Sequence, residues 1–151
     1  VLANGASTER GRALAAFYER YAGNALVIDK WFQTQALAAH PQTVEIVEAL
    51  AAHPDFTLNN PNRARSLFGA FAANQWAFNR ADGKGYRLVA DTIIALDKLN
   101  PQTAARMVPP LGRWRRFDPA RGALMRAELE RIVATPGLSR DVLEQASKSL
   151  A

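Results

Sequence analysis

Two arginines follow the helix start that the sequence predicts at Asn60-Pro61. An asparagine side chain caps a helix well, and proline suits the first helical position because its missing N–H would have no partner there. Arg63 and Arg65 fall in the first turns of this helix, where free backbone N–H groups and the positive end of the helix dipole favour an anion. Positive side chains oppose the dipole at this end, at a small cost. We interpret Asn60, Arg63 and Arg65 as a candidate anion-binding site.

The same arrangement recurs at Asn100-Pro101, where Gln102 and Arg106 follow. Side chains four residues apart lie on one face of a helix, so the amide and the guanidinium form a second polar site near a helix start. A solvated helix face would give the same pattern, and both interpretations stay open on the residues alone.

Residues for catalysis at zinc or at a nucleophile do not occur in a working pattern. A zinc hydrolase typically carries His-Glu-x-x-His, but His40 and His53 each stand in Ala-Ala-His-Pro and neither is followed by glutamate. We interpret both as structural histidines at helix ends. The sequence also lacks Gly-x-Ser-x-Gly and a phosphate-binding Gly-x-x-x-x-Gly-Lys loop. We therefore expect no catalytic residue, metal ligand or cofactor within this chain.

A basic run, Arg113-Trp114-Arg115-Arg116, interleaves arginine with an aromatic residue. Such a run can hold nucleic acid by phosphate contacts and base stacking. Trp114 is expected about one helical turn from Leu111 and Phe117, which favours a place in the core instead. We interpret the run as a helix-end contact with a neighbouring domain rather than a nucleic-acid site.

Composition narrows the class of protein. The 151 residues are 48% hydrophobic, carry a net charge of +5 and include no cysteine, so a packed core is expected without disulfides. Arginine outnumbers lysine, which hints at recognition of carboxylates or phosphates. No apolar run reaches the roughly 18 residues of a membrane span. Because the chain opens at Val1 without a signal-like start, we expect a cytoplasmic fragment of a longer chain, with no membrane partner.

Helical spacing of apolar residues recurs along the chain, and no segment alternates as a strand would. Leu14, Phe17, Tyr18 and Tyr21 form one such stripe, and further stripes follow around Trp31, Val47, Ile93 and Ile132. Helix starts are predicted at Asp118-Pro119 and Ser139, and Pro109-Pro110 should break the helix that begins near Pro101. These patterns predict an all-α protein: a superhelical array of about eight short antiparallel helices, similar to HEAT or armadillo solenoids, forming one domain over 1–151.

The sequence resembles the C-terminal domain of bacterial aminopeptidase N. The matching stretches are 29–32 (Asp-Lys-Trp-Phe), 56–71 (Phe-Thr-Leu-Asn-Asn-Pro-Asn-Arg-Ala-Arg-Ser-Leu-Phe-Gly-Ala-Phe), 82–86 (Asp-Gly-Lys-Gly-Tyr), 100–102 with Arg106, and 117–118. The similarity runs in order from about Glu9 to Ala151. The stretch Asn-Pro-Asn-Arg-x-Arg-Ser-Leu is the most specific part, whereas the segment from Trp76 to Arg80 matches less clearly.

The resemblance implies a zinc metalloaminopeptidase as the parent enzyme, which removes N-terminal amino acids from peptides. Its catalytic motifs lie upstream of this region, so the implied partners are the upstream catalytic domain of the same polypeptide and the peptide substrate. In that family the C-terminal domain is a helical superhelix that closes over the active site. Arginines of the domain line the internal cavity. By motif position these are Arg65 and Arg106, with Gln102 beside the latter.

A different class of function remains open on the sequence. The chain could be a free-standing helical-repeat module that binds nucleic acid or an acidic protein partner. Such a module would bind nucleic acid with a strong dependence on salt, because each neutralised phosphate releases counterions.

Overall fold

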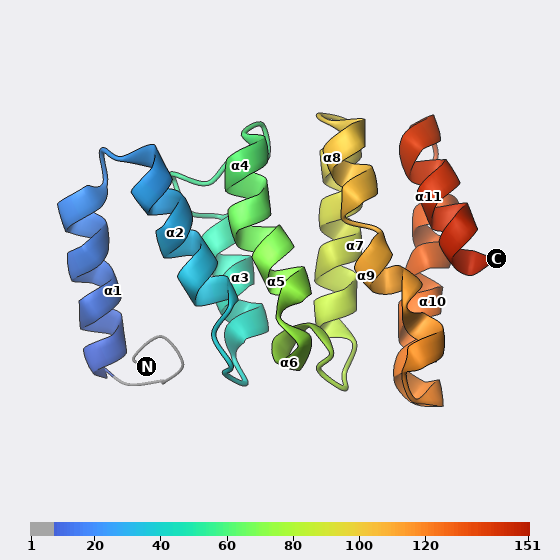
Figure 1. Cartoon of the computed structure of the whole chain (residues 1–151), viewed down its shortest axis with the longest axis horizontal. Coiled ribbons are helices and arrows are strands. Elements are labelled where there is room, and N and C mark those ends of the chain that lie inside the picture. The colour runs from blue at the N-terminus through green and yellow to red at the C-terminus, as the bar shows by residue number, and fades with distance from the viewer. Residues whose placement is uncertain (1–7) are drawn as a thin grey trace. The chain divides into compact units, whose positions relative to one another are not determined.

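The computed structural model describes residues 8–151, and these residues form helices joined by turns, with no strand among them (Figure 1). The all-α fold predicted from the sequence is confirmed. The contacts divide the chain into two compact units, one running to Ala77 and one from Phe78 to Ala151. The prediction of one domain over 1–151 stays a prediction, and each unit is described by itself.

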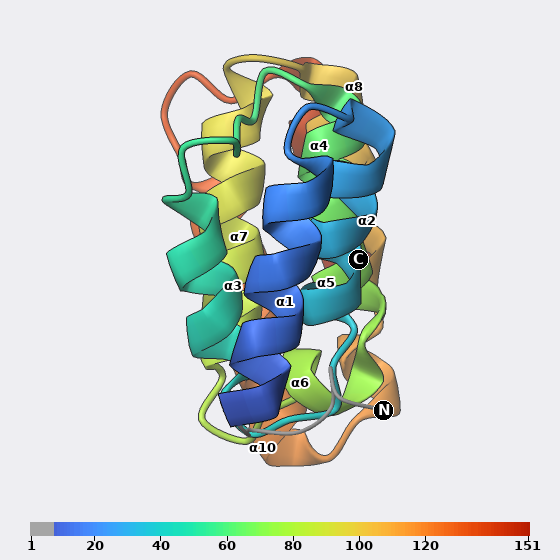
Figure 2. The same cartoon turned by 90° about the vertical axis from the view of Figure 1, so that its left-hand side faces the viewer.

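The first unit is built around α2. Its elements are α1 (Thr8–Tyr21), α2 (Ala25–Ala36), α3 (Thr43–Ala51), α4 (Pro61–Ala64), the π-helical segment η2 (Arg65–Gly69) and α5 (Ala70–Ala73), followed by the short α6 (Gln75–Phe78) at its boundary. The helix α2 packs against α1, α3 and η2. Fully buried side chains from three of these elements, Phe32, Val47 and Leu67, form the core between them. In Figures 1 and 2, α1 is the outermost helix of this unit and lies along α2.

His53 occupies an aromatic cluster rather than a metal site. Its ring lies 5.1 Å from Tyr18, 5.3 Å from Trp31 and 5.7 Å from Phe32, measured between ring centroids. Its Nδ1 accepts a hydrogen bond of 3.1 Å from the N–H of Asp55. Because Nδ1 accepts, the ring carries its proton on Nε2. The histidine therefore fixes the turn that follows α3.

His40 repeats the same turn after α2, with Nδ1 accepting from the N–H of Gln42 at 3.1 Å. Each histidine precedes a proline and accepts from the second residue after itself. The two Ala-Ala-His-Pro stretches thus serve as structural turns. Across residues 8–151, no three histidine or acidic side chains gather as a group that could hold a metal ion.

The second unit is built around α7 and α10. Its elements are α7 (Lys84–Asp97), α8 (Pro101–Arg106), α9 (Pro109–Gly112), the 3₁₀ segment η3 (Trp114–Arg116), α10 (Pro119–Val133) and α11 (Arg140–Leu150). The helix α10 packs on α7 and α11, and α8 packs on α7 and α11 as well. Ile93, Leu111 and Leu129 are fully buried between these helices.

The predicted helix starts are found with their caps. The side chains of Asn60, Asn100, Asp118 and Ser139 each accept a backbone N–H at the start of α4, α8, α10 and α11. The helix that begins at Pro101 ends at Arg106, before the two prolines. Pro109 and Pro110 are instead the first two residues of the next helix, α9. Proline tolerates these first positions because no intrahelical N–H bond is needed there.

The basic run at 113–116 holds the end of α11. The Nε1 of Trp114 donates to the carbonyl of Ser149 at 3.0 Å, and Arg115 Nη2 donates to the carbonyls of Leu150 and Ala151 at 3.1 and 2.8 Å. The Arg115 guanidinium also stacks on the Trp114 ring, 4.1 Å from its centroid. Trp114 and Arg115 are therefore engaged within the unit, which supports a structural role and gives no support to base stacking.

Burial raises the pKa of Tyr86 to about 12, above the 10.0 expected in the unfolded chain. Its hydroxyl donates to Asn79 Oδ1 at 2.8 Å. Since the unfolded state loses this proton first, the contribution of Tyr86 to stability is complete below pH 10 and is lost as the pH rises towards 12.

We expect Tyr86→Phe to flatten the fall in unfolding free energy over this range, measured by urea titrations at several pH values. Equal slopes in both proteins would contradict this prediction.

None of the described helices is both long enough and apolar enough to cross a membrane.

Candidate functional site

The first candidate site begins with Asn60, which has an extended backbone conformation and caps α4. Its Oδ1 accepts the N–H groups of Asn62 at 3.0 Å and Arg63 at 3.2 Å. With Pro61 at the first helical position, this cap fixes where the helix starts and so sets the directions of Arg63 and Arg65. The free N–H groups at this start are consequently bonded by the chain itself. The role of Asn60 in the structure is to position the arginines.

Arg63 points into the first unit. Its side chain is only 9% exposed; its Nε pairs with Asp29 on α2, and its Nη1 donates to the carbonyl of Asp55. The guanidinium also lies over the Phe32 ring, 5.3 Å from the centroid. Asp29 balances the charge of Arg63 within the unit. Arg63 is therefore a buried residue that connects α4 to α2 and to the turn after α3.

Arg65 points outward and is exposed. Its Nη2 donates to Asn62 Oδ1 at 2.5 Å, which leaves the other guanidinium N–H groups for a ligand. The residue opens the π-helical segment η2, between the α-helical turns of α4 and α5. Such segments are rare and occur frequently at functional sites. The π-helical segment was not predicted, because the run Arg-Ser-Leu-Phe-Gly carries no sequence pattern that distinguishes it from an ordinary helix.

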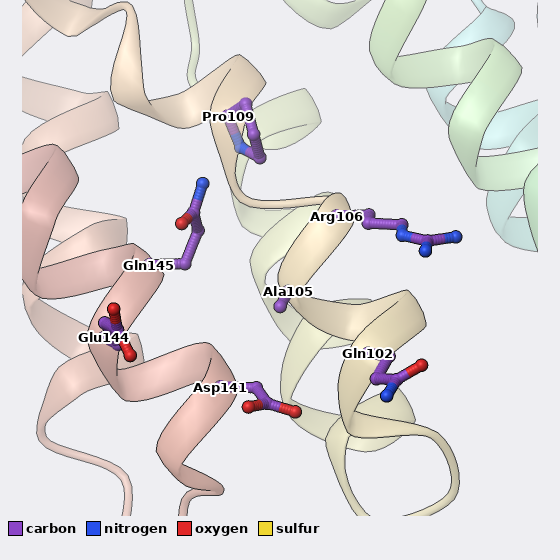
Figure 3. A pocket seen from close by; sticks show the side chains of 7 residues that line it. All are labelled: Gln102, Ala105, Arg106, Pro109, Asp141, Glu144 and Gln145. Carbon is purple, nitrogen blue, oxygen red and sulfur yellow. The ribbon is translucent and has the colours of Figure 1, made fainter.

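The second candidate site is an open groove of about 590 Å³ in the second unit (Figure 3). Gln102 and Arg106 come from α8, and Asp141, Glu144 and Gln145 come from α11. The start of α8 is fixed by Asn100, whose Oδ1 accepts the N–H of Thr103 at 3.0 Å. The buried Thr103 and Ala104 then turn Gln102 and Arg106 outward.

The charges of this groove are separated between its two walls. Figure 3 shows the Arg106 guanidinium directed away from Asp141 and Glu144 on α11. No ion pair or hydrogen bond joins the Arg106 guanidinium to any side chain in the described part of the chain. Arg106 therefore offers an unpaired cation on the side of α8 that also carries the Gln102 amide, and both side chains point away from the two carboxylates of α11 (Figure 3). The Arg106 guanidinium and the Gln102 amide can bind a carboxylate and orient a polar chain.

The structure thus keeps three of the five predicted residues on the surface. Arg65 belongs to the first unit, and Gln102 and Arg106 share one face of α8 in the second. Asp141, Glu144 and Gln145 were not predicted as site residues, since only the packing of α11 on α8 brings them to the groove. Substrate-binding roles for Asn60, Arg63, Arg65, Gln102 and Arg106 stay predictions.

The packed, exclusively helical units place the described chain in the class of helical-repeat proteins. The chain belongs to the family described as a domain of unknown function (DUF3458_C) with ARM repeats, whose model matches residues 1–151.

Relatives in this family confirm the resemblance found in the sequence. The chain is 51% identical over 142 residues to aminopeptidase N of Caulobacter vibrioides, covering 93% of this chain and 16% of that protein. It is 45% identical over 138 residues to aminopeptidase N of Haemophilus influenzae, with 91% of this chain and 16% of the relative covered. The matches fall in the C-terminal region of aminopeptidase N.

A solved structure is similar as well. The crystal structure of Legionella pneumophila aminopeptidase A in complex with aspartic acid superposes with a TM-score of 0.90 at 38% identity. The match covers 94% of this chain and 17% of that one. The chain therefore spans about a sixth of the length of the proteins that it matches.

Proposed function

We propose that this chain is the noncatalytic C-terminal part of a zinc-dependent aminopeptidase N and that its basic residues help to bind the peptide substrate. An upstream part of the same polypeptide performs the hydrolysis that removes N-terminal amino acids. The chain described here caps the cavity in which that reaction occurs. The observation that carries the proposal is the outward placement of Arg65 and Arg106 just after two capped helix starts.

The chemistry of the two sites supports a role in holding the carboxylate end of a peptide. A guanidinium presents a planar fork of donors that matches a carboxylate, and the Gln102 amide can bond the adjoining peptide group. Arg65 is held in place by Asn62, so part of the cost of ordering its side chain is already met before a ligand binds. Arg63, paired with Asp29, supports this arrangement from within the unit.

The residues that the structure describes form no site suited to zinc. The two histidines are used in turns, and no group of potential ligands gathers in the described residues. In this proposal the metal belongs to the upstream part of the enzyme, and no step of the reaction is assigned to residues of this chain.

The proposal is tested in the full-length enzyme with matched substrates. We expect Arg65→Ala and Arg106→Ala each to lower kcat/KM about tenfold for a short peptide with a free carboxylate, because one charge-assisted hydrogen bond contributes about 1.4 kcal/mol. The same peptide with an amidated C-terminus, and a small aminoacyl reporter, should change less than about twofold. Steady-state kinetics on the three substrates give the answer.

Arg87→Ala provides the control, because Arg87 is an exposed arginine of α7 outside the groove. It should leave all three substrates unaffected. Equal losses on the peptide acid, the peptide amide and the reporter in the Arg65 and Arg106 variants would rule out carboxylate binding by these residues.

A further inference from the structure

The basic run at 113–116 borders a second pocket of the second unit, which the candidate functional site does not use. This pocket has a volume of about 420 Å³ and is formed by η3 and the first turns of α10. Two aromatic residues, Trp114 and Phe117, line it together with the small residues Gly122 and Ala123. Three charged side chains also line it. An apolar wall with a few charged groups is the usual form of a small-molecule site.

The two small residues keep this pocket open. A Cβ on Gly122 would lie 2.7 Å from the carbonyl oxygen of Trp114, so glycine is what lets α10 approach η3 this closely. Ala123 is exposed, and its single methyl group leaves the space beside the aromatic rings unfilled. A large side chain at position 123 would occupy that space.

The aromatic wall and the first cation are fixed before a ligand binds. The Trp114 ring is held by the bond of its Nε1 to the carbonyl of Ser149. Arg115 bonds the end of α11, and its guanidinium lies 4.1 Å from the centroid of the Trp114 ring. Within the described part of the chain these bonds use only Nη2, so Nε and Nη1 remain for a ligand. A preformed wall of this kind lowers the entropy cost of binding.

Arg126 adds a second cation to the same ring. Its guanidinium lies 5.4 Å from the centroid of Trp114, and its Nε donates to Glu130 at 2.9 Å. Both members of this ion pair are 55% exposed, so the pair is weak and a ligand can compete with it. The planar fork of a guanidinium matches a carboxylate. Two guanidinium groups beside one aromatic ring therefore form a site for a carboxylate.

Asp118 supplies the opposite charge. The backbone N–H and the guanidinium of Arg121 hold the pKa of Asp118 below its usual value, so the side chain is a carboxylate at neutral pH. It accepts these two bonds at 3.0 and 3.1 Å and stays 45% exposed. Because a carboxylate can accept about four hydrogen bonds, Asp118 can also accept an ammonium group.

We propose that this pocket binds a free α-amino acid with an aromatic or large aliphatic side chain. The ligand carboxylate pairs with Arg115 and Arg126, and its ammonium group pairs with Asp118. Its side chain packs on Trp114 and Phe117. Charge complementarity selects this class of ligand, since an uncharged apolar molecule would leave the charges without partners and a small polar anion would leave the aromatic wall uncovered.

This inference goes beyond the peptide binding proposed above. Free amino acids are the products of the hydrolysis proposed for the parent enzyme, so its reaction would supply the ligand. Only this statement about the source of the ligand rests on the proposed function. The binding itself is argued from the residues of the pocket alone.

Photocross-linking of the full-length enzyme with p-benzoyl-L-phenylalanine tests the proposal, because this probe is an aromatic amino acid that marks the residues it contacts. We expect cross-links within 113–126, located by peptide mass spectrometry, and excess L-phenylalanine should remove them. Hydrocinnamate lacks the ammonium group and phenethylamine lacks the carboxylate. Each should compete about tenfold less well than L-phenylalanine, because each loses one charge-assisted contact.

Two substitutions at exposed positions of α10 test the pocket itself. Ala123→Trp should fill the pocket, and Arg126→Gln should remove one cation, so each is expected to lower cross-linking about tenfold. Ala134→Trp is the matched control for size, at the exposed far end of the same helix. Arg113→Gln is the matched control for charge, because Arg113 is exposed and does not line the pocket. Both controls should cross-link as the unchanged enzyme does.

An absence of cross-links within 113–126, or cross-links that persist unchanged with Ala123→Trp, would overturn the proposal. Equal competition by the three compounds would also overturn it, because it would show an apolar surface that does not recognise the charges of an amino acid. The readout needs no turnover and identifies the pocket by position. A failure of the peptide kinetics proposed above would therefore leave this result unchanged, and the two failures can be told apart.

Discussion

Arg63→Ala is expected to lower the free energy of unfolding of this chain by about 3–5 kcal/mol, the cost of breaking a buried ion pair by removing one partner. Arg63 and Asp29 are both shielded, with side chains 9% and 13% exposed. Water therefore has little access to the Asp29 carboxylate, and its negative charge would be left without a partner. The carbonyl of Asp55 would lose its donor in the same variant. Urea unfolding followed by circular dichroism gives the measurement.

The control stands two residues away. Arg65→Ala removes the same side chain from an exposed position and should change stability by less than about 0.5 kcal/mol. The double variant Asp29→Leu with Arg63→Met should recover part of the loss, because apolar side chains replace both buried charges. A loss at Arg63 no larger than that at Arg65 would show that the pair contributes little to the fold.

Gly85→Ala is the second large effect, and we expect a loss of roughly 2–3 kcal/mol from overpacking. A Cβ at this position would lie 2.5 Å from the carbonyl oxygen of Phe78 and 3.1 Å from its carbon. These are backbone atoms of the same unit, which cannot rotate away as a side chain could. The first turn of α7 or the segment around Phe78 would have to shift, and Tyr86, which packs on Phe78 at 5.0 Å between ring centroids, would be disturbed.

Gly11→Ala serves as its control, because a Cβ there meets nothing within 4 Å. Gly11 lies within α1, one turn after its start, where the substitution should raise stability by about 0.5–1 kcal/mol through the higher helix propensity of alanine. Urea midpoints of the two variants should therefore move in opposite directions. A neutral result for Gly85→Ala would mean that the close approach of α7 to Phe78 is not needed for folding.

Local signals in the sequence were enough to predict the helices and most of their starts. Asn60, Asn100, Asp118 and Ser139 cap helices because a short polar side chain before a helix bonds its first N–H groups whatever lies elsewhere in the fold. The helix end before His40-Pro41 follows the same local logic, since the residue before proline avoids helical geometry.

The candidate sites needed information that is not local. Arg63 and Arg65 follow the same cap and look alike in sequence, yet one is buried on Asp29, a residue far away along the chain, and the other is exposed. The acidic wall of the second groove likewise depends on how α11 packs against α8. Residue types and spacing predicted which helix starts carry basic side chains. Tertiary contacts determine which of these side chains are paired inside the protein and which are exposed to a ligand.

The link between the end of α7 and the start of α11 has a consequence for how the second unit folds. Asp97 accepts the N–H of Ser139 at 2.8 Å and also its hydroxyl, a contact between residues 42 positions apart in the chain. The bond from Arg121 Nε to the carbonyl of Asn79 spans the same separation. Each contact closes a long loop, and the entropy of closure is lost before the bond is gained. Helices of this unit can form early, but their assembly must await these distant pairings, so its folding rate is set by chain topology more than by helix propensity.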